Sequence, residues 1–204
     1  MSRKGYIGTF KRGVKKNSNT ERKINIDVHT QLNTNKKGDI KKIGMLHVTE
    51  ETILIMDSNR AHIDPYKFWK GHTVRKLKAG NIQEAKEILE GYHFDNAKYI
   101  ILHIGTNDVE KSNVSAEITK SIINIASSLN MKYKMAKVFV SQLPPRNDNL
   151  NWISQNVNNL MQHSLPESLY LIDNSNITTK MLYDKKHIRE DHIGMLVYNM
   201  KKNS

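Results

Sequence analysis

The sequence of 204 residues contains no cysteine. This absence excludes disulfide bonds, thiolate nucleophiles and zinc sites with cysteine ligands. No apolar run approaches the roughly 20 residues that a membrane-spanning helix needs. The basic N-terminus has no apolar segment behind it, so we do not expect a secretory signal. These absences predict an intracellular protein, cytoplasmic or nuclear, without a membrane span.

Several glycine motifs with known chemistry are also missing. The sequence has neither a Gly-x-x-x-x-Gly-Lys-Ser/Thr loop nor a Gly-x-Gly-x-x-Gly turn, which gives no support to phosphate-loop or dinucleotide binding. It has no Gly-x-Ser-x-Gly elbow, which argues against an ordinary α/β-hydrolase. We therefore expect a protein without a cofactor.

The positive charge is concentrated near the N-terminus. Residues 1–49 hold twelve Lys/Arg against three Asp/Glu, a net charge of +9, whereas the other 155 residues add only +3 to the total of +12. We predict a basic, flexible arm over residues 1–49 and a folded domain over residues 50–204. The arm has two interpretations: it binds nucleic-acid phosphates by counterion release, or it is a solvated tail. Four basic pairs favour the first, but no interleaved aromatic residues support base stacking.

From residue 51 onward, short apolar runs alternate with amphipathic stretches. The runs predict five strands, at residues 52–56, 73–77, 99–104, 137–141 and 169–172, of which the second is the weakest and fits an edge strand. Helical spacing of apolar residues predicts helices near residues 82–89, 118–129, 153–161 and 193–200, the first opened by a capping box at Asn81 and Glu84. This alternation predicts an α/β fold, a three-layer α/β/α sandwich with a mostly parallel five-stranded sheet of flavodoxin-like type.

In such sheets, ligands bind beyond the carboxyl ends of the strands. The first predicted strand is followed by Asp57-Ser58, the second by Ala79-Gly80 and the third by Gly105-Thr-Asn107-Asp108. Asp184-Lys-Lys-His187 follows the fifth strand and precedes the last helix. We expect these four turns to meet at one edge of the sheet.

Together the four turns supply the parts of acyl-transfer chemistry. A serine hydroxyl needs a base to remove its proton, and His187 is the candidate base for Ser58. A carboxylate at Asp184 would hold the other ring nitrogen and fix the tautomer. The backbone N–H groups of Ser58 and Gly80 and the side-chain amide of Asn107 would form the oxyanion hole.

These residues resemble the conserved blocks of the SGNH (GDSL-like) hydrolases. Ile53-Leu-Ile-Met-Asp-Ser-Asn is similar to the first block, Gly80 to the second, Gly105-Thr-Asn-Asp108 to the third and Asp184-x-x-His187 to the fifth. The resemblance covers residues 52–202 and implies a serine esterase with a Ser58–His187–Asp184 triad. Within the family, Ser58-Asn-Arg-Ala-His-Ile and Gln142-Leu-Pro-Pro-Arg146 most resemble the esterase domains encoded by some animal retrotransposons. Met56 departs from the family, which usually has glycine there, and a larger side chain beside the nucleophile could alter packing or narrow the pocket.

Each residue also has a structural interpretation. Ser58 alone would suit a helix N-cap, and Asn107 would suit a turn. We expect Asp57 to orient or cap and Asp108 to be structural. His103 lies inside a strand pattern and is expected to be a core histidine with its hydrogen bonds satisfied. The spacing of His187 and His192 fits no standard zinc pattern, so we expect no metal.

Two functional hypotheses remain open. The first is an esterase that cleaves small carboxylic esters or O-acetyl groups through an acyl-enzyme on Ser58. The alternative is a weak or inactive protein of the same fold that acts in nucleic-acid binding or assembly through its basic arm. The four blocks support the first, and the arm and Met56 support the second.

Overall fold

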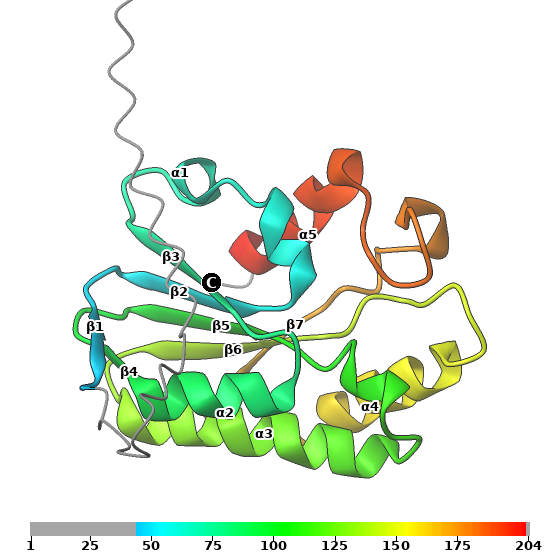
Figure 1. Ribbon diagram of the computed structural model, residues 1–204, viewed down its shortest axis with the longest axis horizontal. Helices are drawn as coiled ribbons and strands as arrows, with labels where there is room; N and C mark the ends of the chain where they lie inside the picture. Colours follow the sequence, from blue (N-terminus) through cyan, green and yellow to red (C-terminus); the bar gives the residue numbers. More distant parts are fainter. Residues whose placement is uncertain (1–43, 203–204) are drawn as a thin grey trace, which may run out of the picture. The chain divides into compact units, whose positions relative to one another are not determined.

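The computed structural model describes residues 44–202, and its main element is a five-stranded sheet (Figure 1). The strands are β2 (Thr52–Met56), β3 (Val74–Lys78), β5 (Tyr99–His103), β6 (Lys137–Ser141) and β7 (Tyr170–Ile172). Every neighbouring pair is parallel, and the order is β3-β2-β5-β6-β7. All five strands therefore end at the same edge, and β2, which precedes Ser58, lies next to the central strand β5.

The predicted strands agree with this sheet. β2 and β6 have the predicted bounds, and β3 is shifted by one residue and lies at the edge of the sheet, as its weak pattern indicates. β2 is apolar and buried throughout because the neighbouring strands and the helices on both faces leave no side exposed. A continuous apolar run is thus the signature of its central position.

Alternate strand residues pack against opposite helical layers. Ile53 and Ile55 belong to a core shared with α2 (Ile82–Gly91), α3 (Ser115–Lys132) and α4 (Asn151–Ser164). Leu54 and Met56 belong to a second core with α1 (Pro65–Phe68) and α5 (Ile193–Lys202). Figure 1 shows the two groups of helices on opposite faces of the sheet. The predicted α/β/α sandwich is confirmed, and none of the helices within residues 44–202 is both long and apolar enough to span a membrane.

A small second sheet extends the domain toward the N-terminus. β1 (Leu46–Val48) pairs in parallel with β4 (Tyr92–Phe94), and Val48 and Phe94 join the first core. Strands of three residues carry too little periodicity to be recognised in a sequence. Residues 46–48, which the arm prediction includes, thus pair with the domain, whereas all twelve basic residues of the predicted arm lie outside the described residues.

Candidate active site

Ser58 lies directly beyond the carboxyl end of β2. It opens a single 3₁₀ turn over Ser58–His62, and its side chain is exposed. The Asp57 carboxylate caps the turn by accepting a hydrogen bond from the Asn59 N–H (3.0 Å), which confirms the capping role predicted for Asp57. The Ser58 hydroxyl has no hydrogen-bond partner within residues 44–202, so the structure does not form the predicted contact between Ser58 and His187.

Asp184 and His187 form a close pair in the loop before α5. His187 Nδ1 lies 2.7 Å from Asp184 Oδ2, while Asp184 Oδ1 accepts hydrogen bonds from the backbone N–H groups of Lys186 and His187 (both 2.8 Å). Burial alone would raise the pKa of Asp184, but the hydrogen bonds from His187 and the two backbone groups outweigh it and lower the pKa to about 2. An ionised carboxylate only accepts hydrogen bonds, so Nδ1 carries the proton and Nε2 keeps its lone pair.

Three hydrogen bonds connect the four predicted turns. The backbone N–H of Ile188 donates to Asn59 Oδ1 (3.1 Å), which joins the neighbours of His187 and Ser58. Asn107 Nδ2 donates to the Gly80 carbonyl oxygen (2.6 Å), and Lys186 Nζ donates to Asn107 Oδ1 (2.7 Å). The fold therefore brings all four sequence blocks to one edge of the sheet, as their positions after the strands predict.

The candidate oxyanion donors differ in their availability. Ser58 is the first residue of a 3₁₀ helix, and the first backbone N–H groups of a helix have no hydrogen-bond partner within it. The Gly80 N–H donates to Glu84 Oε2 at 2.7 Å, and a Cβ at Gly80 would lie 3.2 Å from this oxygen. The same carboxylate accepts from Asn81 Nδ2 (2.8 Å). Gly80 can serve as an oxyanion donor only after the Glu84 carboxylate moves away.

The turn after β5 depends on glycine and on Asp108. Gly105 has a φ of +114°, and a Cβ there would lie 2.9 Å from Ile122 Cδ1, so both its backbone and its surroundings require glycine. Asp108 Oδ2 accepts from the Ile82 N–H at the start of α2 (3.1 Å), which confirms its predicted structural role. Burial raises the pKa of Asp108, against this hydrogen bond.

Three charged residues behind Asn107 were not predicted as part of the site. Lys186 Nζ donates to both carboxylate oxygens of Glu110 (2.9 Å each) as well as to Asn107. The Arg146 guanidinium, 2% exposed, donates to Glu110 (2.9 Å) and to the carbonyl oxygen of Thr106 (3.1 Å). Lys186 stands inside the Asp184-x-x-His187 block, but spacing alone cannot show where a long side chain points.

The comparisons with known proteins were informative at the level of structure. No family model matches the sequence, and no curated protein matches it. Solved structures do match: a candidate platelet activating factor from Streptococcus pneumonia has a TM-score of 0.63 at 19% identity, over 76% of this chain and 84% of that one. A lipolytic protein of the G-D-S-L family from Veillonella parvula has a TM-score of 0.57 at 17% identity, over 74% and 96%.

An acetyl xylan esterase is a third similar structure, with a TM-score of 0.55 at 13% identity over 74% of this chain and 98% of that one. With the parallel sheet and its helices, these likenesses decide the fold. The fold is that of the SGNH/GDSL hydrolases.

Two buried residues of this SGNH fold lie beside the turn that holds Ser58. Met56, at the usual glycine position, is fully buried in the core with α1 and α5, so the packing accommodates it. His103 is also fully buried, as predicted, and its Nδ1 lies 2.9 Å from Ser141 Oγ. The prediction that its hydrogen bonds are satisfied is wrong for Nε2, which has no hydrogen-bond partner in the described part of the chain. Burial lowers the pKa of His103, against the nearby Asp57 carboxylate.

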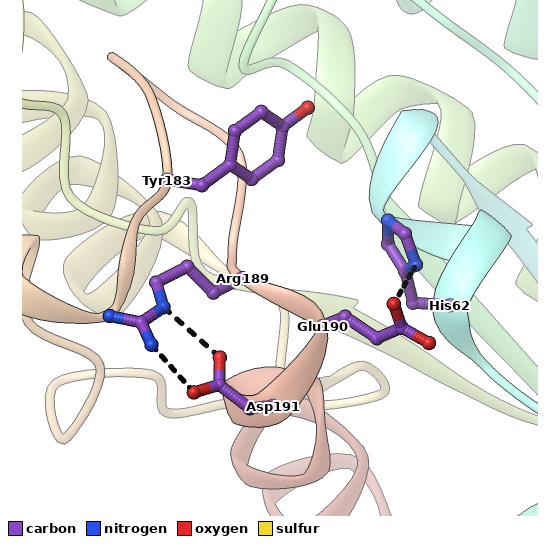
Figure 2. A pocket seen from close by; sticks show the side chains of 5 residues that line it. All are labelled: His62, Tyr183, Arg189, Glu190 and Asp191. Carbon is purple, nitrogen blue, oxygen red and sulfur yellow. Dashed lines mark hydrogen bonds and ion pairs between the residues drawn. The ribbon is translucent and has the colours of Figure 1, made fainter.

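A surface hollow lies in the loop region before α5, and none of the predicted site residues lines it. It has a volume of about 630 Å³ and is lined by an aromatic ring, a histidine and three charged side chains: His62, Tyr183, Arg189, Glu190 and Asp191. The Tyr183 ring stacks on the His187 imidazole, with 5.6 Å between centroids and 13° between planes. Figure 2 shows the paired Arg189 and Asp191 on one side of the hollow and His62 with Glu190 on the other. Within residues 44–202, no three His, Asp or Glu side chains form a cluster that could hold a metal ion.

Proposed function

We propose that the protein is a serine esterase that cleaves small carboxylic esters or O-acetyl groups through an acyl-enzyme on Ser58. The observation that carries the proposal is the set of hydrogen bonds that joins the turns of Ser58, Asn107 and Asp184–His187 at one edge of the sheet. The turns meet where parallel sheets place their ligands. An exposed serine, a histidine held by an ionised carboxylate and an amide donor are the groups that acyl transfer requires.

Each group has a defined part in the reaction. Ser58 Oγ attacks the ester carbonyl carbon while His187 Nε2 takes the hydroxyl proton. Asp184 holds Nδ1 and stabilises the imidazolium, and the Ser58 N–H and Asn107 amide bind the oxyanion. The alcohol leaves with the proton from His187. A water molecule, deprotonated by His187, then attacks the acyl-enzyme, and the acid leaves as Ser58 recovers its proton.

The small size of the substrate is inferred from the surroundings of His187. The hollow lined by Tyr183, whose ring stacks on His187, is open and carries charged side chains, which suits a polar alcohol part better than a long acyl chain. One of the structural neighbours is an acetyl xylan esterase, whose substrates carry a short acyl group on a polar alcohol. We therefore infer a short acyl group, with the alcohol part in contact with Tyr183.

Labelling with a fluorophosphonate tests the proposal directly, because the probe reacts with activated serines. We expect one probe per chain, located on Ser58 by peptide mass spectrometry. Labelling should disappear in His187→Ala, which retains Ser58 but loses its base. An unlabelled chain, or a label on a different serine, would reject the esterase.

The basic N-terminal residues carry a second candidate function, nucleic-acid binding. The net charge of +9 over residues 1–49 supports it, as does the resemblance to retrotransposon-encoded domains. Neutralising the four basic pairs in the full-length chain should weaken RNA or DNA binding and reduce its dependence on salt. The substitutions are Lys→Gln and Arg→Gln at Lys15, Lys16, Arg22, Lys23, Lys36, Lys37, Lys41 and Lys42. Unchanged affinity and salt dependence would reject the role of the arm.

A further inference from the structure

The side-chain amide of Asn107 is held from both ends. Its Nδ2 donates to the Gly80 carbonyl oxygen at 2.6 Å, and its Oδ1 accepts from Lys186 Nζ at 2.7 Å. An ammonium group only donates and a carbonyl oxygen only accepts, so the two partners permit one orientation of the amide. The second Nδ2 hydrogen has no partner within residues 44–202 and remains available for an oxyanion.

Lys186 is itself fixed in place by a charged network. Its ammonium uses its three hydrogens on Asn107 and on the two oxygens of Glu110, and the side chain is 18% exposed. Hydrogen bonds from Lys186 and then Arg146 lower the pKa of Glu110, against a smaller effect of burial. The buried Arg146 anchors Glu110 and also holds the Thr106 carbonyl oxygen, one residue before Asn107. The network therefore supports both the backbone and the side chain of the Asn107 turn.

The charge of Lys186 has a second effect on the amide. A cation 2.7 Å from a carbonyl oxygen makes a charge-assisted hydrogen bond, which is shorter and stronger than a neutral one. It draws electron density toward Oδ1 and makes the Nδ2–H groups better donors to a developing negative charge. Preorganised donors of this kind act without reorganisation at the moment of reaction.

We propose that Lys186 is a positioning residue for the oxyanion hole, which orients and polarises the Asn107 amide toward the transition state. The proposal rests on the proposed esterase function. Lys186 acts through Asn107 rather than on the substrate, because all three of its hydrogens are already engaged. Lys186, the residue directly before the proposed base His187, thus acts on the oxyanion hole and takes no part in proton transfer.

The test begins with Lys186→Met, which removes the charge and the donor but keeps most of the volume. With p-nitrophenyl acetate, we expect kcat to fall about 10- to 50-fold while KM changes less than threefold, because the lost interaction acts in the transition state. Lys186→Arg keeps a cation and should retain more activity than Lys186→Met. Lys185→Met, at the exposed neighbouring position, is the matched control and should leave kcat unchanged.

A double-mutant cycle with Asn107→Ala separates positioning from a general structural effect. Asn107→Ala alone should lower kcat about 10²- to 10³-fold, the usual loss for one oxyanion donor. If Lys186 acts through Asn107, the double variant is as slow as Asn107→Ala, within about threefold. If the two losses multiply, Lys186 acts by another route and the proposal is wrong.

The outcomes for the two proposals can be distinguished. An active wild type whose Lys186→Met variant retains its kcat overturns the role of Lys186 and leaves the esterase intact. A wild type that hydrolyses no ester and takes no fluorophosphonate label overturns the esterase and, with it, the catalytic role of Lys186. If Lys186→Met loses its cooperative thermal transition, Lys186→Gln, which also removes the charge, replaces it: a fall in kcat with unchanged KM supports positioning, and an unchanged kcat rejects it.

Discussion

Ser58→Ala is expected to lower kcat/KM for p-nitrophenyl acetate at least about 10³-fold, equivalent to about 4 kcal/mol of transition-state stabilisation. The substitution removes the nucleophile and leaves the oxyanion donors and His187 in place, so a small residual rate above the buffer hydrolysis should remain. The measurement is the initial rate at several substrate concentrations. Since Ser58 is exposed and its hydroxyl has no partner within the described residues, the free energy of unfolding should change by less than about 0.5 kcal/mol.

Ser175→Ala provides a control matched in position. Ser175 is also exposed and also follows a strand, β7, and a preceding carboxylate, that of Asp173, accepts its N–H (2.8 Å). The Ser175 hydroxyl donates to Asp173 Oδ2 (3.0 Å), and Ser175 lies outside the four predicted turns. Equal losses in Ser58→Ala and Ser175→Ala, or no loss in either, would rule out a specific nucleophile at Ser58.

His187→Ala should lower kcat by about 10³- to 10⁴-fold, because it removes the proposed acceptor of the Ser58 proton. Asp184→Asn should have a loss of similar order: an amide that donates to Nδ1 would hold the imidazole in the tautomer whose Nε2 carries the proton. Steady-state kinetics and fluorophosphonate labelling rates measure both effects. A variant at either position with wild-type kcat would exclude that residue from the triad.

The pKa of Asp184 makes a prediction about the pH profile of the wild type. Folding lowers this pKa from 3.8 to about 2, so the carboxylate is ionised at every pH above about 4. Its contribution to stability is complete above its unfolded pKa and is lost as the pH falls from about 4 to 2. A fall in kcat/KM between pH 8 and 5 is therefore not a titration of Asp184. Fitting the profile of kcat/KM and following unfolding by circular dichroism distinguish the two effects.

The sequence patterns predicted the fold well because most of its elements are periodic. β2 and β6 are buried on both faces and appear as continuous apolar runs, so their bounds could be read directly. The two-stranded sheet of β1 and β4 was missed because three residues give no readable period. The prediction that the four turns meet at one edge required only the parallel order of the strands.

The site was less predictable where long side chains decide the contacts. Glu84 was recognised as a capping-box residue, but its carboxylate reaches the N–H of Gly80, one residue before the N-cap Asn81. Lys186 and Arg146 stand inside recognised motifs, but their flexible side chains could reach several partners. The sequence pattern predicts where the backbone lies. The hydrogen-bond partner of a long side chain, however, becomes clear only in the packed structure.

If Gly80 is a third oxyanion donor, its hydrogen bond to Glu84 couples catalysis to the stability of α2. The Gly80 N–H either receives the Glu84 carboxylate or donates to an oxyanion, so its use in the reaction is an exchange of one anion for another. The stabilisation of the transition state by this donor is then reduced by the loss of the helix-terminal contact. Because the oxyanion and the Glu84 carboxylate would compete for the Gly80 N–H, the two effects are reciprocal. An anion bound at Gly80 would loosen the first turn of α2, and a ligand that tightens this turn would weaken binding of the oxyanion.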